Sequence, residues 1–150
     1  MEFNPIGVIH SPYKERGDAP SQGRLSQNEI SIEVFDSYVE GLQQIELLSH
    51  LIILYGGDKA DRIILRSKTV FSDSEIGVFA SRSPNRPNPI AFCVADLVRR
   101  DGNILIVKGV DALDGSPLLD IKAYSPSIDS FPNAVSWKSI NGVDRSHKGI

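Results

Sequence analysis

The chain contains one cysteine and three histidines among its 150 residues, and both shortages exclude whole classes of site. A single cysteine allows no disulfide framework within the chain and no cysteine-rich metal centre. The histidines stand apart from one another and from carboxylates at ligand spacing, which disfavours a zinc hydrolase and a Ser-His-Asp enzyme. We therefore expect no metal. Cys93 lies in an apolar run, so a buried core cysteine is favoured over a catalytic thiol.

Long hydrophobic runs and an excess of positive charge are also missing. No run approaches the ~20 apolar residues that cross a bilayer, and the N-terminus lacks the basic region of a signal peptide. We expect a cytoplasmic protein without membrane contact. The net charge of −3 gives no overall attraction to nucleic acid, so any RNA contact must come from a local patch. The basic residues between Lys59 and Lys68 are a candidate patch. The alternative is that they lie on solvent-exposed strand faces and bind no RNA.

The pattern of apolar residues indicates short strands. Residues 30–34 alternate with a period of two, as half-buried strands do. Asp101-Gly102 is a hairpin signal that joins a run at residues 90–98 to one at residues 104–107. Asp36 is a candidate N-cap for a brief helix over residues 38–48. Further β-type runs cover residues 6–9, 50–55, 62–65, 70–71 and 77–80.

The sequence has no βαβ rhythm, GxGxxG motif or P-loop, which excludes the usual dinucleotide and phosphate folds. We predict a mainly β fold, with one domain over residues 1–150 built as a β-barrel of short antiparallel or mixed strands. One or two short helices accompany the barrel. After Pro126 the pattern becomes polar and loose, with Trp137 as its one large apolar anchor. This part is predicted to be an extended C-terminal tail that wraps over the barrel or over a partner subunit.

The segment at residues 77–91, GVFASRSPNRPNPIA, is the most informative for function. Its three prolines, Pro84, Pro87 and Pro89, bracket Arg86 and Asn88. Because proline fixes its own φ and restricts the preceding residue, the segment is rigid and presents guanidinium, amide and hydroxyl groups in preset positions. We predict that residues 82–89, here named the proline corner, form the wall of a small-molecule pocket. The alternative is a simple corner whose arginines reach solvent.

Two other segments are weaker signals when taken alone. Residues 113–122, LDGSPLLDIK, contain the Asp-Gly and Ser-Pro pairs that commonly turn a chain. Here residues 115–118 are named the glycine bend. Asp120 and Lys122 further along could form a plain surface pair. Residues 11–14, SPYK, are followed by a stretch around Pro20 that could be a flexible loop.

Together these segments resemble a known family. Residues 77–90 closely resemble the signature of the TrmO (YaeB-like, VirR) family of S-adenosylmethionine-dependent tRNA methyltransferases, and residues 6–14, 114–122 and 128–132 agree with it in order and spacing. The resemblance covers nearly the whole chain. It implies a β-barrel that dimerises, binds S-adenosylmethionine outside the Rossmann mode, and methylates N6 of threonylcarbamoyladenosine next to the anticodon of tRNA.

Carried over by position, the resemblance implies a cofactor site. Its residues are Gln22, Gly23, Arg24, Asp58, Lys59, Arg82, Phe92, Gly115, Ser116, Pro117 and Leu118. Bacterial relatives typically place a histidine and a polar residue where this chain has Asp58-Lys59. The chain also resembles the short form of the family, without the extra C-terminal domain of longer bacterial members.

The chemistry of methyl transfer to N6 suggests further residues. A nitrogen conjugated to a carbamoyl group is a poor nucleophile until its proton leaves, so a base should lie near the acceptor. We expect Tyr124, Lys122 and Asp120 to be catalytic. Residues Arg86, Asn88 and Lys14 are expected to bind the tRNA anticodon loop, whose single-stranded bases splay outward easily.

Two other readings remain open at this point. The first is a barrel that binds S-adenosylmethionine without this activity, as a sensor or an RNA-binding module. The second is a methyltransferase with another acceptor.

Overall fold

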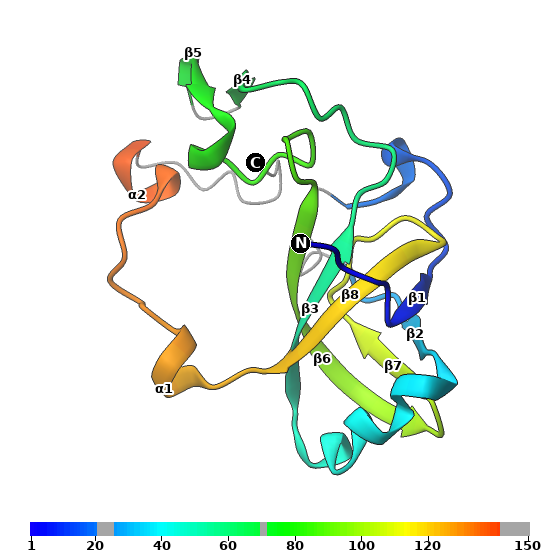
Figure 1. The fold of residues 1–150 in the computed structure, drawn as a ribbon. Coiled ribbons are helices and arrows are strands. Elements are labelled where there is room, and N and C mark those ends of the chain that lie inside the picture. The colour runs from blue at the N-terminus through cyan, green and yellow to red at the C-terminus, as the bar shows by residue number, and fades with distance from the viewer. Residues whose placement is uncertain (21–25, 70–71, 142–150) are drawn as a thin grey trace.

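Residues 1–20, 26–69 and 72–141 are described by the structure, a computed structural model. Within these residues, six strands form a closed antiparallel barrel in the order β1-β2-β7-β6-β3-β8, and β8 pairs back to β1 (Figure 1). The barrel strands are β1 (Gly7–His10), β2 (Ile30–Val34), β3 (His50–Gly56), β6 (Ile90–Asp101), β7 (Ile104–Lys108) and β8 (Ser116–Ala123). The prediction of a mainly β barrel is confirmed.

Alternating apolar residues fill the barrel interior. In β2, Ile30, Ile32 and Val34 are buried, while the residues between them are only half-buried. In β3, Leu51 and Ile53 are fully buried in the same core. Burial of each such side chain is worth about 1.5–3 kcal/mol relative to leaving it exposed. The period-two pattern therefore determines which face of each strand points into the barrel interior.

The predicted hairpin at Asp101-Gly102 is confirmed, because it joins β6 to β7 in antiparallel register. Gly102 has a φ of 63°, which a residue without Cβ adopts at no steric cost. The predicted helix at residues 38–48 is instead two short 3-10 helices, η3 (Asp36–Leu42) and η4 (Ile45–Leu47). Gln44 between them is left-handed, with a φ of 69°, and this interrupts the helix.

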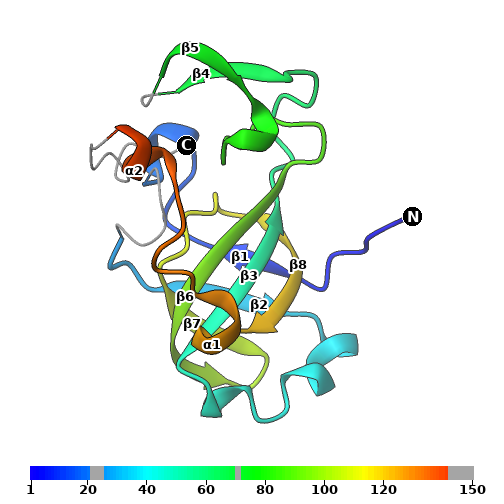
Figure 2. The same cartoon turned by 90° about the vertical axis from the view of Figure 1, so that its left-hand side faces the viewer.

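The predicted strand at residues 62–65 is wrong. Ile63 is 87% exposed and Leu65 is 59% exposed, so neither side chain enters the core. Among the described strands, β4 (Arg66–Thr69) pairs with β5 (Ser72–Gly77) alone, in a separate two-stranded sheet. This sheet lies beyond one end of the barrel (Figure 2). The 3-10 helix η5 (Val78–Ala80) follows β5, and η1 (Arg16–Asp18) lies near the start of the chain.

The C-terminal tail contains two short helices, α1 (Pro126–Asp129) and α2 (Trp137–Asn141). Helix α1 follows the end of β8, and the tail then stands off from the barrel and reaches α2 at the end where β5 lies (Figure 1). There the indole Nε1 of Trp137 donates a hydrogen bond of 2.7 Å to the carbonyl oxygen of Ala80. Trp137 thus ties the tail to the segment that precedes the proline corner. Among the described helices, none has the length and apolar character needed to cross a membrane.

Candidate functional site

The proline corner and the glycine bend lie on either side of the end of β3. The last residue of β3, Gly56, pairs with Ile90 at the start of β6, and Gly57 donates its N–H to the carbonyl oxygen of Pro89 at 2.8 Å. On the other side, a Cβ added to Gly56 would come within 3.1 Å of Pro117. The two segments therefore share one end of the barrel, here named the site end.

Arg86 holds the proline corner together from within. Its Nη1 donates hydrogen bonds to the carbonyl oxygens of Ser81 and Ser83 at 3.2 and 3.1 Å, and its Nη2 donates to that of Val78 at 3.0 Å. The side chain is half-buried. Arg86 therefore has a structural role in the single chain. No local signal in the sequence indicates this structural role. The role of Arg86 in substrate binding stays a prediction.

The loop after β3 is fastened to the proline corner by a second arginine. Arg62 donates from Nε to the carbonyl oxygen of Pro87 at 2.8 Å and from Nη2 to the amide oxygen of Asn88 at 3.4 Å. Asp58 and Lys59 lie in this loop, and both are exposed at the site end. The structure thus places two predicted cofactor residues and one predicted substrate residue close to one another.

Two further predicted cofactor residues are in direct contact. The guanidinium carbon of Arg82 lies 5.9 Å from the centroid of the Phe92 ring, within the usual range of a cation–π interaction. Arg82 also donates from Nη2 to the carbonyl oxygen of Phe92 at 3.4 Å. The Phe92 ring is 47% exposed, so the interaction leaves much of it open to a ligand.

The glycine bend is braced by the N-terminal segment. Lys14 Nζ lies 2.7 Å from Asp114 Oδ2, and the backbone N–H of Ser11 donates to Asp114 Oδ1 at 3.0 Å. The hydrogen bond from Lys14 is the main cause that lowers the pKa of Asp114. Gly115 has a φ of 83°, and nothing would lie within 4 Å of a Cβ there. The N–H of Gly115 donates to the carbonyl oxygen of Ile9 at 2.8 Å, and Leu118 is fully buried, so the bend is paired with the N-terminal strand. The missing side chain of Gly115 leaves open space on the outer side of the bend.

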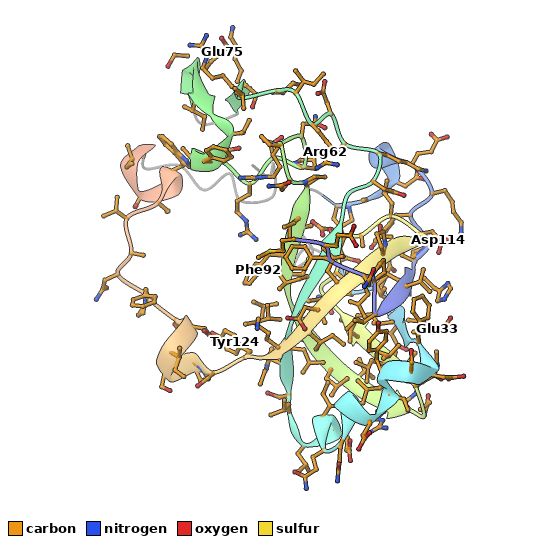
Figure 3. All side chains as sticks on the ribbon, viewed as in Figure 1. Glu33, Arg62, Glu75, Phe92, Asp114 and Tyr124 are labelled. Atoms are coloured by element: carbon orange, nitrogen blue, oxygen red, sulfur yellow. The ribbon has the colours of Figure 1, made fainter. Side chains whose placement is uncertain are left out.

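Of the three predicted catalytic residues, Asp120 and Lys122 lie on β8 after the bend, and Tyr124 follows the strand. Lys122 is paired with Ile52 of β3, and its Nζ lies 3.5 Å from Asp120 Oδ2. Tyr124 follows the end of β8, where its ring centroid lies 6.1 Å from that of His50. Figure 3 shows Tyr124 and Phe92 on the side of the barrel that faces the tail, with Asp114 on the other side. Within a single chain, Tyr124 therefore lies near Phe92 and away from the glycine bend.

A hollow of about 420 Å³ connects Phe92 with Tyr124. It lies between the outer face of the barrel and the first part of the tail. We name it the aromatic hollow. Its lining residues are Ile52, Phe92, Val94, Tyr124, Asp129, Ser130, Phe131 and Pro132.

A buried polar cluster lies at the site end of the core. Tyr55 donates from its hydroxyl to Asp111 Oδ1 at 2.6 Å, and the Cys93 thiol donates to the same oxygen at 3.1 Å. Burial, followed by the charge of Asp111, raises the pKa of Cys93 to about 12 and also raises that of Tyr55. The prediction of a buried cysteine is confirmed. Tyr55 and Asp111 were missed, because no local pattern in the sequence connects them.

Three predicted cofactor residues, Gln22, Gly23 and Arg24, lie outside the described residues. In the part of the chain that the structure describes, no group of three or more histidine, cysteine, aspartate or glutamate side chains could hold a metal ion.

Residues 8–130 match the family model described as the tRNA-methyltransferase O N-terminal domain. The chain belongs to the TrmO family. A solved structure of TrmO from Pseudomonas aeruginosa superposes with a TM-score of 0.77 at 32% identity, covering 91% of this chain and 61% of that one.

Other TrmO relatives differ in length. An S-adenosyl-L-methionine-binding protein of Archaeoglobus fulgidus is 51% identical over 129 residues, which are 86% of this chain and 93% of the relative. The tRNA (adenine(37)-N6)-methyltransferase of Escherichia coli is 35% identical over 148 residues, covering 89% of this chain and 62% of that enzyme. A second Archaeoglobus fulgidus protein, a probable S-adenosyl-L-methionine-binding protein, is 50% identical, and this chain spans 38% of its length.

Proposed function

We propose that this TrmO-family chain is an S-adenosylmethionine-dependent methyltransferase that acts on N6 of threonylcarbamoyladenosine next to the anticodon of tRNA. Membership of the family and the activity named for the Escherichia coli relative support the proposal. The structural observation that carries it is the position of the proline corner and the glycine bend, on either side of the end of β3. Both segments contain family motifs, and they meet at one end of the barrel.

The residues at the site end suit a methyl donor that combines a purine, a ribose and an amino acid. The half-exposed ring of Phe92 offers a flat apolar surface for a purine, and the missing side chain of Gly115 leaves room for a ligand beside the bend. Asp58 and Lys59 add exposed charges of both signs for an amino acid with charged ends. When bound, the cofactor supplies the methyl group. Arg82, Ser116, Pro117 and Leu118 complete the described part of the proposed cofactor site, with Gln22, Gly23 and Arg24 beyond it.

Asp120, Lys122 and Tyr124 are the proposed catalytic residues. Proton removal from N6 requires an acceptor within hydrogen-bond reach, and the Asp120 carboxylate and the Tyr124 hydroxyl are acceptors. The Lys122 ammonium, 3.5 Å from Asp120, would balance the negative charge of that carboxylate. The main contribution of the protein is to hold the acceptor nitrogen and the methyl group in line.

The proposed tRNA contacts are Arg86, Asn88 and Lys14, assisted by the exposed Arg66 and Lys68 of the outlying sheet. Such cations would bind phosphates locally despite the net negative charge of the chain. Because the substrate is tRNA, we place the protein in the cytoplasm.

A homodimer is also part of the proposal. Apolar side chains of the tail and of η5 are exposed in the single chain, namely Ile128, Val135, Ile140 and Phe79. Exposed apolar side chains along such a tail are candidates for burial against a second chain. A second chain docked there could bring its own glycine bend toward Tyr124 of the first.

Mass spectrometry of tRNA incubated with the protein and S-adenosylmethionine tests the activity. We expect a gain of one methyl group on the modified adenosine beside the anticodon, and none when the cofactor is left out. Unchanged tRNA despite cofactor binding in calorimetry would favour a barrel that binds S-adenosylmethionine as a sensor. Asp58-Lys59 suggests this alternative, because the two residues depart from the pair typical of bacterial relatives. A methyl group on another nucleoside would instead indicate a different acceptor.

A further inference from the structure

The aromatic hollow is lined by part of the family segment at residues 128–132, and this part has no role in the function proposed above. Residues 129–132 form one wall, and the outer face of β3 and β6 forms the other. Phe131 is held on a turn that is closed by a hydrogen bond of 3.0 Å from the N–H of Ala134 to the Phe131 carbonyl oxygen. The Phe131 side chain is 75% exposed although it lines the hollow, and an exposed aromatic ring of this size needs an explanation.

The shape and lining of the hollow suit a flat ligand with π-faces. Besides Phe92, which the proposed function assigns to the cofactor, Tyr124 and Phe131 contribute aromatic rings from two separate elements. The volume of about 420 Å³ lies at the small end of the range of roughly 300–1,000 Å³ that is usual for ligand pockets. A single nucleoside fits such a space, whereas a paired base would not be free to enter it.

The polar group in the hollow is a hydrogen-bond acceptor. Asp129 Oδ2 accepts the backbone N–H of Ser125 at 2.8 Å, which fixes the carboxylate at the end of α1. No described residue donates to its Oδ1, so this oxygen is available to a ligand. A carboxylate accepts from a ligand N–H group, which the exocyclic nitrogen of adenine or of cytosine carries, and the proposed function favours adenine.

Charges beside the hollow suit a nucleotide. Arg82 lies against the Phe92 ring, and Lys122 is paired with Ile52, which lines the hollow. Cations at the rim would contact the phosphates that flank an extruded base.

We propose that the aromatic hollow is the pocket for the adenine base of an unpaired nucleotide of tRNA, with Phe131 stacking on the base and Asp129 accepting an N–H of its N6 substituent other than the one removed in methyl transfer. The proposal rests on the function proposed above, and it adds the location of the acceptor base. It assigns binding roles to two residues outside the predicted catalytic set.

The stacking role is tested with a fluorescently labelled anticodon stem-loop RNA and the Phe131→Ala variant. Loss of one base–aromatic stack should weaken RNA binding on the order of tenfold. Phe131→Trp should restore it. S-adenosylmethionine affinity, measured by calorimetry, should not change in either variant. The matched control is Phe3→Ala, which removes an aromatic ring that is 68% exposed near the N-terminus and should leave RNA binding unchanged.

The hydrogen bond is tested by replacing the adenine with purine, which lacks the exocyclic amine. This change should weaken RNA binding by the wild-type protein but have no added effect on Asp129→Ala, which has no acceptor at this position. Equal sensitivity of both proteins to the change would overturn the role of Asp129.

Two outcomes separate this pocket from the function on which it rests. Normal RNA binding and tRNA methylation by Phe131→Ala would overturn the pocket and leave the methyltransferase standing. If that variant also became monomeric, the hollow would be an interface between copies of the chain. A wild-type protein that bound neither cofactor nor RNA would overturn both proposals.

Discussion

At the scale of single residues, Arg86 determines the shape of the proline corner. Its guanidinium donates to three backbone carbonyl oxygens, and hydrogen bonds from a charged donor are worth about 1.5–3 kcal/mol each. We predict that Arg86→Ala lowers the free energy of unfolding by about 2 kcal/mol or more, measured by denaturant titration. Arg86→Lys should not restore it, because one ammonium lacks the planar fork that reaches three acceptors. Wild-type stability of the alanine variant would contradict this role.

The Cys93 thiol makes the stability dependent on alkaline pH. Burial raises its pKa from the usual 9.0 to about 12 in the folded chain. Above pH 9 the unfolded chain therefore loses this proton first, and deprotonation favours unfolding. We predict that the free energy of unfolding falls between pH 9 and pH 12, with a shallower fall in Cys93→Ala. Identical slopes for the two proteins in urea titrations would show that Cys93 does not contribute.

Single residues also show where prediction from sequence ends. The prolines and the Asp-Gly pair indicated rigid segments, since their backbone preferences are local. The contact of Tyr55 with Asp111 spans 56 positions and depends on barrel closure, so no local pattern predicts it. The internal role of Arg86 was equally hidden, because an arginine in a loop is usually assumed to face solvent or a ligand.

At the scale of elements, the pairing of β1 with β2 depends on a glycine. A Cβ on Gly7 would overlap the carbonyl oxygen of Glu33 in the neighbouring strand. Because a backbone atom cannot move aside, we predict that Gly7→Ala destabilises the fold by about 1–3 kcal/mol or more. The control is Gly41→Ala, where a Cβ would meet nothing within 4 Å. A similar melting temperature for both variants would contradict this account of the β1–β2 junction.

The sheet of β4 and β5 is a candidate arm for tRNA. Arg66 and Lys68 are exposed on β4, beyond the barrel. We predict that the double variant Arg66→Ala, Lys68→Ala weakens tRNA binding and reduces its salt dependence, by about 0.9 in log–log slope for each lost phosphate contact. Cofactor affinity should be unchanged. The control is Arg99→Ala, near the β6–β7 hairpin, and an equal effect of this variant would mean that the arm has no special role.

The elements differ in how far the sequence predicts them. β2 and the β6–β7 hairpin were predicted, because alternation and the Asp-Gly turn are strong local signals. Residues 62–65 look like a strand but lie outside the core, where Arg62 instead fastens the loop to the corner. A short apolar run with β-branched residues can form a buried strand or an exposed loop, and the tertiary contacts decide which of the two forms.

At the scale of the whole molecule, barrel closure brings the two motif segments together. The corner precedes β6 and the bend opens β8, and both strands pair with β3, so the two segments meet where β3 ends. The family signature predicted that they share a site. The sequence alone could not give the strand order that makes this possible, because β3 pairs with strands distant from it along the chain.

A crystal structure of this chain with S-adenosylmethionine would show whether the cofactor binds at the site end. We predict electron density for the cofactor between residues 82–89 and residues 115–118, within one chain or across a dimer, with its adenine beside Phe92. Density at a distance from both segments would contradict the assignment of the site end, even if the protein still methylated tRNA.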